Sequence, residues 1–359
     1  MSTVPAPATT GWVIAGAGWV ARDHMAPALA ASPTSRVVAV VDRDLGAARA
    51  LAERFPGARA TDDLADGFAT PGARVAYVAT PNHAHREVAA AAAAAGLAVL
   101  CEKPLAAALP DAAELVAACE GAGVLAATAF DQRWHPAHRA AADLVASGRL
   151  GTVTAVRIVY GCWLPPGWAP PGSTTGDNWR VDPARAGGGA YVDLAPHGLD
   201  LVGALLGEDV ERATTLVQHR VHDYAVDDGS VLVGATGSGT LVTIHNSFNT
   251  VETLPRRRLE VVGTAAQLVA TDTMGQTAGG RLELLDTATG EAAEVPFDAQ
   301  LSPFAAQVRA VEEHLDDPGS WPFPLARDLR LLHLLHDALG SGVPSSAPHP
   351  TLSAQEVPS

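Results

Sequence analysis

Cysteine is scarce in this sequence, and its few thiols form no recognisable pattern. The 359 residues include only Cys101, Cys119 and Cys162, which lie far apart and form no CxxC pair. An odd number of isolated cysteines argues against a disulfide framework and is typical of a reducing compartment. We therefore expect three small core side chains in a cytoplasmic protein.

Positive charge is also in short supply. The 24 Lys and Arg residues stand against 39 Asp and Glu residues, which gives a formal net charge of −15. The one basic cluster, Arg256-Arg257-Arg258, lies beside an apolar run and is typical of a solvated strand edge. Because phosphate backbones repel an acidic chain, no nucleic acid is expected as a partner.

Long hydrophobic runs are missing as well. The most apolar stretch, 88–100, is too short to cross a bilayer and is interrupted by Gly96. The opening segment, MSTVPAPATT, has neither the charged nor the apolar region of a secretory signal. We expect no contact with membranes.

Apolar residues nevertheless make up 48% of the chain, which is enough for the cores of two domains. Up to about residue 130, short β-rich runs alternate with helical stretches, as in a doubly wound parallel sheet of an α/β protein. The predicted strands are 12–15, 36–41, 75–79, 97–101 and 124–128, and the predicted helices are 20–31, 46–55, 84–95 and 110–121.

Farther along, strands follow one another with turns such as Asp228-Gly229 between them. This pattern favours an α+β domain on an open, largely antiparallel sheet. A loop rich in Pro, Gly and Trp, 163–176, interrupts it, and loops of this length are often functional. The expected strands are 153–160, 212–221, 230–236, 240–248, 258–262 and 282–285, and the expected helices are about 192–206, 303–315 and 325–339.

These elements predict a simple division of the chain. It consists of a loose lead-in (1–10), a Rossmann dinucleotide-binding domain (11–130), an α+β substrate domain (131–325), a C-terminal helix (326–341) and a flexible tail (342–359).

A glycine-rich turn follows the first predicted strand. Gly16 and Gly18 match the first two glycines of GxGxxG/A, and Ala21 takes the third place. In this motif the glycines permit a tight turn and let backbone amides approach a pyrophosphate, while the small third residue lets helix and strand pack closely. Trp19 and Val20 lie between them and are expected to contact the dinucleotide. The match alone also fits a plain tight turn.

An acidic residue ends the second predicted strand. Asp42 lies 24 residues after Gly18, about where a carboxylate binds the ribose hydroxyls of NAD. A carboxylate there repels the 2′-phosphate of NADP, so NAD is favoured, but Arg43 can accept that phosphate and leaves NADP open. The alternative for Asp42 is a turn or helix-capping residue.

Four further blocks follow in order: Ala79 to His85 (ATPNHAH), Glu102-Lys103-Pro104, Trp179-Arg180, and Gly187 to Asp200 (GGGAYVDLAPHGLD). Together with the dinucleotide motif they resemble the Gfo/Idh/MocA family, which includes glucose–fructose oxidoreductase and inositol dehydrogenase, over about residues 11–341. One departure is Ala195-Pro196, where the family usually has glycine. Because proline is costly beyond the first turn, the helix is expected to begin near Pro196 or to kink there.

The resemblance implies a catalytic set of Lys103, Asp193 and His197. Lys103 follows a parallel strand, where open α/β sheets bind ligands, and its ammonium can polarise the reacting oxygen. His197 titrates near neutrality and suits a general base in oxidation or an acid in reduction. Asp193 lies one helical turn earlier and can bind a hydroxyl or orient either partner. Without the family pattern, Asp193 and His197 would be taken for a surface ion pair.

The resemblance also implies further site residues. Thr80, Pro81, Asn82 and His85 are expected to line the cofactor, although Pro-Asn also makes plain turns and the histidine can simply cap a helix. The expected cofactor contacts also include Glu102, Lys103, Trp179 and Arg180, and the expected substrate contacts are Arg133, Trp163, Trp168, Asp177, Asn178, Asp193 and His197. The two loop tryptophans fit an aromatic wall for a substrate or plain loop anchors equally well.

The implied activity is hydride exchange between a nicotinamide and a secondary alcohol or ketone of a sugar, an inositol or a related polyhydroxylated molecule. By resemblance, the open second sheet forms a homodimer or homotetramer. Two other classes within the family remain open, a glycoside hydrolase that retains its NAD and a catalytically silent ligand sensor. No metal is expected, because the pairs His83/His85 and His333/His336 have no further ligands beside them.

Overall fold

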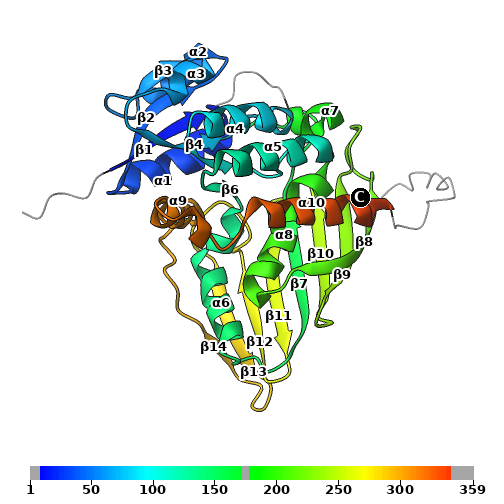
Figure 1. Cartoon of the computed structure of the whole chain (residues 1–359). Helices are drawn as coiled ribbons and strands as arrows, with labels where there is room; N and C mark the ends of the chain where they lie inside the picture. Colours follow the sequence, from blue (N-terminus) through cyan, green and yellow to red (C-terminus); the bar gives the residue numbers. More distant parts are fainter. Residues whose placement is uncertain (1–8, 172–177, 341–359) are drawn as a thin grey trace, which may run out of the picture.

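A computed structural model of the chain describes residues 9–171 and 178–340 (Figure 1). Its first domain has a parallel sheet in the order β3-β2-β1-β4-β5-β6. Because β1 lies inside the sheet and the chain winds outward from it in both directions, the predicted doubly wound topology is confirmed. The strands are β1 (Thr10–Ala15), β2 (Ser35–Val41), β3 (Arg59–Thr61), β4 (Ala73–Val78), β5 (Ala98–Cys101) and β6 (Ala126–Thr128).

Helices cover both faces of this sheet, because alternate strand residues point into opposite cores. Val13 and Ala15 of β1 pack with α3, α4 and α5, whereas Trp12 and Ile14 pack with α1, α2 and α9. The helices of this layer are η1 (Ala21–Met25, a π-helix), α1 (Ala26–Ala31), α2 (Leu45–Ala52), α3 (Leu64–Phe68), η2 (Asn82–Ala84), α4 (His85–Ala94) and α5 (Leu109–Ala122).

Helix α9 (Pro303–His314) belongs to this first layer although it comes late in the chain. Phe304 and Val308 are buried in the same cluster as Met25 of η1. Glu312 accepts a hydrogen bond from the indole of Trp12, with 2.9 Å between Oε1 and Nε1. The expected division assigned this helix to the substrate domain, because an apolar helical pattern does not specify which core receives it.

The second domain is built on a sheet in the order β14-β13-β12-β11-β7-β10-β9-β8. All neighbours in it are antiparallel except β7 and β10, so the predicted open, largely antiparallel sheet is confirmed. Its strands are β7 (Val153–Gly161), β8 (Val210–Gln218), β9 (Gly229–Thr236), β10 (Leu241–Ser247), β11 (Arg257–Gly263), β12 (Ala266–Thr271), β13 (Arg281–Asp286) and β14 (Ala292–Glu294).

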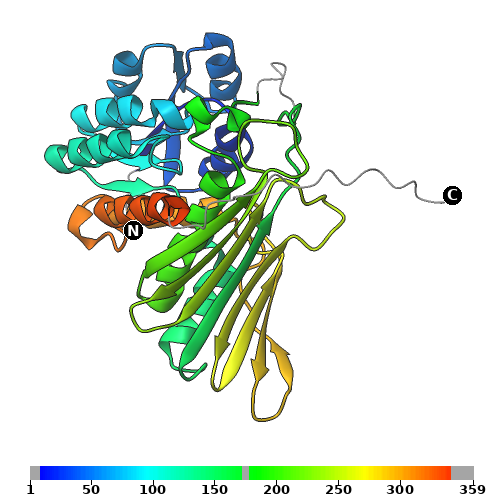
Figure 2. The same ribbon diagram turned by 90° about the vertical axis from the view of Figure 1, so that its right-hand side faces the viewer.

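Helices α6 (Pro136–Ala146) and α8 (Ala190–Leu206) pack on one face of this sheet, and among the described residues no helix covers the other (Figures 1 and 2). Helix α6 was not predicted from the sequence; its buried residues, Ala137, His138 and Ala141, are small or polar. Strands β3, β12 and β14 and helix α3 were not predicted either. Short turns complete the fold: η3 (Asp131–Trp134), η4 (Trp179–Val181), α7 (Pro183–Ala186) and η5 (Pro318–Ser320).

Helix α8 begins at Ala190, so the expectation that it begins near Pro196 is wrong. The carboxylate of Asp227 caps its N-terminus by accepting hydrogen bonds from the amides of Gly189 (3.0 Å) and Tyr191 (2.8 Å). Burial of 14 of the 17 helix residues supports the helix through Pro196, which deprives one carbonyl of its helical donor.

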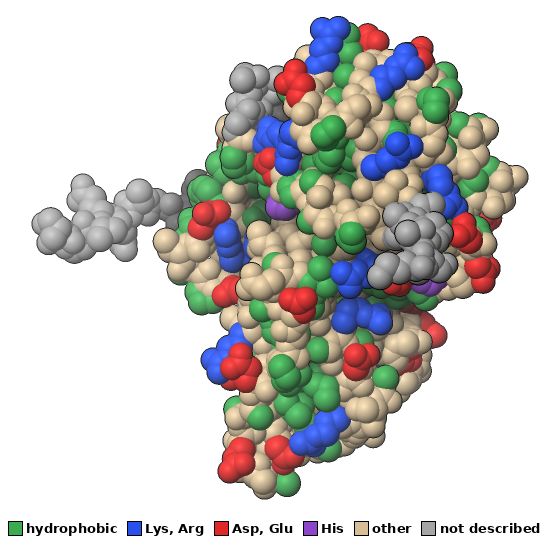
Figure 3. All heavy atoms as spheres, turned by 90° about the vertical axis from the view of Figure 1, so that its left-hand side faces the viewer, with side chains coloured by type: hydrophobic (Ala, Val, Ile, Leu, Met, Phe, Trp, Pro, Cys, Tyr) green, Lys and Arg blue, Asp and Glu red, His purple; other side chains and the backbone are tan. Residues whose placement is uncertain are grey.

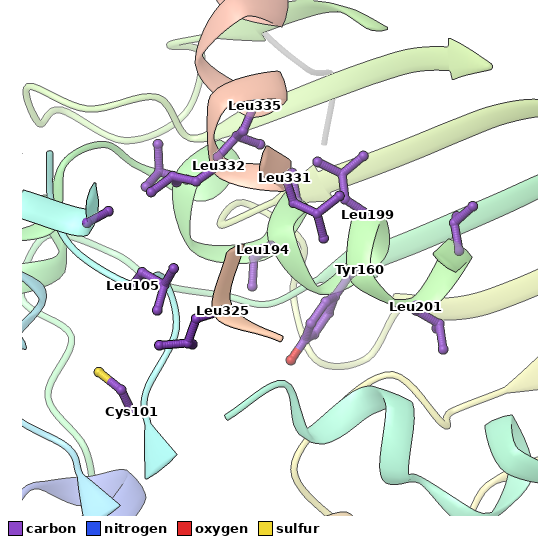
Figure 4. Packing of buried hydrophobic residues seen from close by; sticks show 14 of the residues in the cluster. Cys101, Leu105, Tyr160, Leu194, Leu199, Leu201, Leu325, Leu331, Leu332 and Leu335 are labelled. Carbon is purple, nitrogen blue, oxygen red and sulfur yellow. The ribbon is translucent and has the colours of Figure 1, made fainter. Parts of the chain in front are cut away.

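Helix α10 (Leu325–Gly340) joins the two domains by packing against α5, α8 and β8. Its leucines point toward α8 and toward the chain that leaves β5 (Figure 4). The same helix carries Arg327, whose Nη1 lies 2.6 Å from Oδ1 of Asp200 in α8. A buried ion pair and an apolar cluster therefore fix α8 relative to the first domain.

The glycine before α8 provides a test of this packing. A Cβ atom added to Gly189 would overlap the carbonyl oxygen of Asp227, so Gly189→Ala should lower the free energy of unfolding by about 1–3 kcal/mol. Gly121→Ala is the matched control, because Gly121 lies within helix α5 and a Cβ there meets nothing within 4 Å. Denaturant unfolding of both variants measures the difference. Equal stability of the two would contradict the close approach of Gly189 to Asp227.

Candidate active site

The carboxyl ends of the central parallel strands open into a cleft of about 780 Å³ between the two domains. The first domain contributes the glycine turn and the segments after β2, β4 and β5, and the second contributes α8 and the η4 turn. Open α/β sheets bind ligands at this position. The predicted site residues that line the cleft are Gly16, Gly18, Trp19, Val20, Asp42, Arg43, Thr80, Pro81, Asn82, Glu102, Lys103, Trp179, Arg180, Asp193 and His197.

The glycine turn has the shape that a pyrophosphate requires. Gly16 has a φ of +103°, and a Cβ there would collide with the backbone of Ala79. A Cβ on Gly18 would meet nothing closer than 3.9 Å and would fill the cradle instead. Ala21, in the third place of the motif, is fully buried against the sheet. The residues present therefore fit a dinucleotide.

Asp42 braces this turn. Its Oδ2 accepts a hydrogen bond from the amide of Ala17 at 2.7 Å, and its Oδ1 accepts one from the amide of Asp44 at 2.9 Å. The carboxylate is therefore a turn residue, which was the alternative that the sequence left open, and it lies at the wall of the cleft with Arg43 beside it.

Lys103 and Asp193 join the two domains across the cleft. The Nζ atom of Lys103, the only lysine in the chain, lies 2.6 Å from Oδ1 and 3.1 Å from the backbone oxygen of Asp193. Burial by itself would raise the pKa of Asp193, but the charges of Lys103 and Arg180 outweigh it and lower that pKa. At neutral pH Asp193 is therefore a carboxylate that accepts hydrogen bonds from the side chain of Lys103.

His197 lies one turn after Asp193 on the same helix. Its ring meets Phe130 and Tyr160 edge-on, at centroid distances of 5.9 and 5.6 Å, and the residue is 2% exposed. Burial, together with the charge of Lys103, holds the pKa of this imidazole well below its usual range. The ring is therefore neutral at pH 7 and can accept a proton.

Two further carboxyl groups lie beside this set. Tyr77 donates a hydrogen bond of 2.6 Å to Oε1 of Glu102, and burial raises the pKa of this glutamate. Asp131 begins the η3 turn after β6 and lines the cleft with Oδ1 3.3 Å from Nδ1 of His197. The sequence analysis missed Asp131, although its place just beyond a parallel strand is the same signal that indicated Lys103.

Aromatic rings close the mouth of the cleft around Arg180. Its guanidinium carbon lies 4.6 Å from the ring centre of Trp179, 5.5 Å from that of Trp168 and 5.8 Å from that of Trp19. Trp168 also meets Trp19 edge-on at 5.7 Å, and Arg22 donates a hydrogen bond to the carbonyl of Pro171. The loop after β7 thus reaches the glycine turn of the other domain.

The side chains of two predicted cofactor residues already have protein partners, and one of the two, His85, does not line the cleft. The ring nitrogens of His85 lie 2.8 Å from the carbonyl oxygen of Thr80 and 2.9 Å from that of Pro104, and burial lowers the pKa of this histidine to about 4. His85 thus connects the turn at Thr80 with the turn at Pro104. The side chain of Asn82 donates to the carbonyl of Ala186 at 2.9 Å and links the first domain to α7.

The expected substrate residues need similar correction. Arg133 is 1% exposed, lies with Nε 3.2 Å from Oδ2 of Asp200 and is absent from the cleft wall. Asn178 donates to the carbonyl of Pro165 at 3.3 Å, so it supports the loop. Trp163 packs on His222 with 4.7 Å between ring centres, outside the cleft. Asp177 lies outside the described residues.

Among residues 9–171 and 178–340, no three His, Cys, Asp or Glu side chains are placed to hold a metal ion. No helix in these ranges is both long enough and apolar enough to cross a membrane. In the basic cluster, Arg258 and Arg256 pair with Glu260 (2.6 Å) and Glu252 (3.3 Å). Charges of both signs are interspersed on the face shown in Figure 3.

Comparison with known families identifies the family to which this chain belongs. Residues 10–130 match the model of the oxidoreductase family with an NAD-binding Rossmann fold (GFO_IDH_MocA), and residues 138–269 match its GFO/IDH/MocA C-terminal domain. The chain is a Gfo/Idh/MocA oxidoreductase. The resemblance inferred from its motifs is thereby confirmed, and with it an enzyme that binds NAD(P).

Relatives of this oxidoreductase act on sugars. It is 32% identical to 1,5-anhydro-D-fructose reductase from Ensifer adhaerens over 307 residues, which is 84% of this chain and 88% of the relative. It is 34% identical to levoglucosan dehydrogenase from Pseudarthrobacter phenanthrenivorans over 51% of this chain and 44% of that protein. A solved levoglucosan dehydrogenase in complex with NADH and levoglucosan shares its fold, with a TM-score of 0.80 at 20% identity over 92% of this chain and 96% of the other.

The brace of the glycine turn predicts an effect on cofactor binding. Asp42→Ala removes the partner of the Ala17 amide, so the Kd for NADH should rise about tenfold, the loss of one hydrogen bond to a charged group. NADPH should lose less, because the repulsion of its 2′-phosphate disappears as well. Asp63→Ala is the control, since Asp63 caps α3 through the amide of Asp66 and does not line the cleft. Fluorescence titration with both cofactors measures the change; unchanged NADH affinity would refute the role of Asp42.

Proposed function

We propose that this oxidoreductase transfers a hydride between a nicotinamide and a secondary alcohol or ketone of a sugar or a related polyhydroxylated molecule. The observation that carries this proposal is that Lys103, Asp193 and His197 all line the cleft that begins at the glycine turn, with Lys103 and Asp193 joined by a hydrogen bond. The named activities of its relatives on 1,5-anhydro-D-fructose and levoglucosan support the substrate class.

The nicotinamide would supply the hydride acceptor or donor. The backbone around Gly16 and Gly18 would hold the pyrophosphate, and Asp42 and Arg43 would lie nearest the adenosine ribose. We favour NAD because a carboxylate borders this region, and Arg43 keeps NADP as the alternative.

Lys103 polarises the reacting oxygen in this proposal. Its ammonium has three donors, and Asp193 takes up one or two of them. A remaining proton can be donated to a substrate hydroxyl and stabilises the negative charge that develops on its oxygen. Because Asp193 stays ionised, it holds the ammonium charged and in place. Asp193 is thus the positioning partner of the lysine.

His197 moves the proton. In oxidation its neutral ring accepts the hydroxyl proton of the substrate while the hydride leaves from the same carbon, and in reduction the imidazolium returns that proton. The low pKa of His197 keeps its ring unprotonated before an alcohol is oxidised.

Replacing this base tests the proposed mechanism. His197→Ala should lower kcat by about 10²–10⁴-fold and leave NADH affinity nearly unchanged. The control is His333→Ala, which changes an exposed histidine of α10. Activity on a panel of sugars and inositols, followed by NADH absorbance, measures the loss. Full turnover of the His197 variant would remove this residue from the mechanism, and cleavage of glycosides with retained cofactor and no net NADH would favour the hydrolase class.

We also propose that a second copy of the chain covers the open sheet. Its uncovered face carries exposed apolar residues on neighbouring strands, namely Leu216 of β8, Val233 of β9 and Leu241 of β10. Val233 is 47% exposed and Leu241 is 60% exposed, and large apolar patches of this kind mark interaction surfaces.

A charge on this face tests the assembly. Val233→Asp would bury an unpaired carboxylate between two copies, so it should shift a dimer or tetramer to monomers in light scattering after size exclusion. Val251→Asp is the control, because Val251 is 38% exposed and lies in a loop outside the strands. A monomeric wild type, or an unchanged mass for the Val233 variant, would rule out this face as the interface.

A further inference from the structure

One carboxylate in the cleft has no part in the reaction described so far. Asp131 is 2% exposed and His197 is 2% exposed, yet both contribute to the cleft wall. The distance from Oδ1 of Asp131 to Nδ1 of His197 is 3.3 Å. A carboxylate at Nδ1 of a histidine selects the tautomer with the proton on that nitrogen and leaves the lone pair on Nε2.

We propose that Asp131 is a positioning residue that holds His197 as a base. Its carboxylate accepts a hydrogen bond from the N–H at Nδ1 of His197, so that Nε2 presents its lone pair to the substrate hydroxyl. The proposal rests on the hydride transfer proposed above. It assigns Asp131 a role that the family motifs do not include, since this residue lies outside the four blocks that carry the resemblance.

The side chain of Asp131 is held so that one oxygen faces His197. Its other oxygen, Oδ2, accepts a hydrogen bond of 2.9 Å from the amide nitrogen of Gln132. Two hydrogen bonds to Gly275 fix the side-chain amide of Gln132. Its Nε2 donates to the carbonyl of Gly275 at 2.9 Å, and its Oε1 accepts from the backbone amide of Gly275 at 3.1 Å. Gln276, the next residue, lines the cleft, so the same glutamine connects the carboxylate to the far wall.

His197 depends on this contact, because other protein groups leave its nitrogens free. Among the described residues, neither ring nitrogen has a hydrogen bond of good geometry, and such bonds in ligand-free sites often tighten only when substrate binds. An imidazolium would also face the positive charges of Lys103 and Arg133. Asp131 and Asp193 are the negative groups that can offset them.

Protons and electrons balance in this arrangement. The C–H electron pair of the alcohol leaves as hydride to the nicotinamide, and the O–H proton goes to Nε2 of His197. The Nδ1 proton stays shared with Asp131, and the alcohol carbon becomes a ketone. The pair formed by Asp131 and His197 thus carries one proton more than before the reaction, and this extra proton is released from Nε2 before the next turnover.

The surroundings of Asp131 set its pH dependence. Charged or titratable groups reach it from β4 (Tyr77), from the end of β5 (Glu102, Lys103), from β7 (Tyr160) and from α8 (His197). Burial, followed by the charge of Glu102, raises the pKa of Asp131 to about 7, while Lys103 acts in the opposite direction. The carboxylate is therefore lost as the pH falls below neutrality, and alcohol oxidation should fall with it.

The decisive variant is Asp131→Asn in the full chain. The plateau of kcat for oxidation should drop about 10²-fold, because the imidazolium loses its nearest negative partner. The acid limb of the profile should move to lower pH, since His197 alone then titrates and its pKa lies well below the usual range. Asp131→Glu restores a carboxylate and should return the limb toward that of the wild type. The proposal would be overturned if the plateau of kcat fell while the acid limb of the pH profile stayed in place, or if kcat did not fall at all.

A second measurement does not depend on activity. Imidazole ¹⁵N NMR of the protein without cofactor, with the His197 signals identified by difference against His197→Gln, should show a protonated Nδ1 in the wild type and a loss of this preference in Asp131→Asn. A wild-type His197 with its proton on Nε2 would overturn the proposal, even if the Asn variant did not fold. If the tautomer is as expected but no sugar or inositol is oxidised, the positioning stands and the proposed function fails.

Discussion

The ion pair between Lys103 and Asp193 is the contact on which the arrangement of the site depends. It connects the end of a strand in one domain to a helix of the other, across the cleft that both domains line. A partly buried pair of this kind contributes little net stability, because desolvation of two charges cancels much of their attraction. Its value lies in position: it keeps the ammonium of Lys103 at a fixed separation from the helix that carries His197, as the proposed mechanism requires.

The rest of the fold supports this geometry from behind. Asp227 caps α8, Arg327 pairs with Asp200 farther along the same helix, and the leucines of α10 pack against it. Few residues of α8 touch solvent, so this helix has little freedom to slide or rotate. The proposed hydride transfer requires such rigid support, since its reacting atoms must approach closely.

The sequence predicted those parts of the site that lie in continuous motifs. The glycine turn, Lys103 and the pair of Asp193 and His197 could be located because local backbone geometry and a turn of helix fix their directions. Asp131 could not, because its relation to His197 exists only in the folded chain. Arg133 was predicted to contact substrate for the same reason, because the sequence does not distinguish a buried arginine with acidic partners from an arginine that binds substrate. The burial of His138 between the alanines of α6 and the first-domain position of α9 likewise depend on tertiary packing.

The use of a single lysine has a practical consequence. The other 23 of the 24 Lys and Arg residues are arginines, whose guanidinium stays protonated and does not react as an amine. Apart from the N-terminus, the amine chemistry of the whole molecule is therefore confined to one atom at the centre of its cleft. Besides the N-terminal amine, reagents selective for primary amines would report on that atom alone, so that cofactor or substrate occupancy could be followed by the protection of the Lys103 nitrogen.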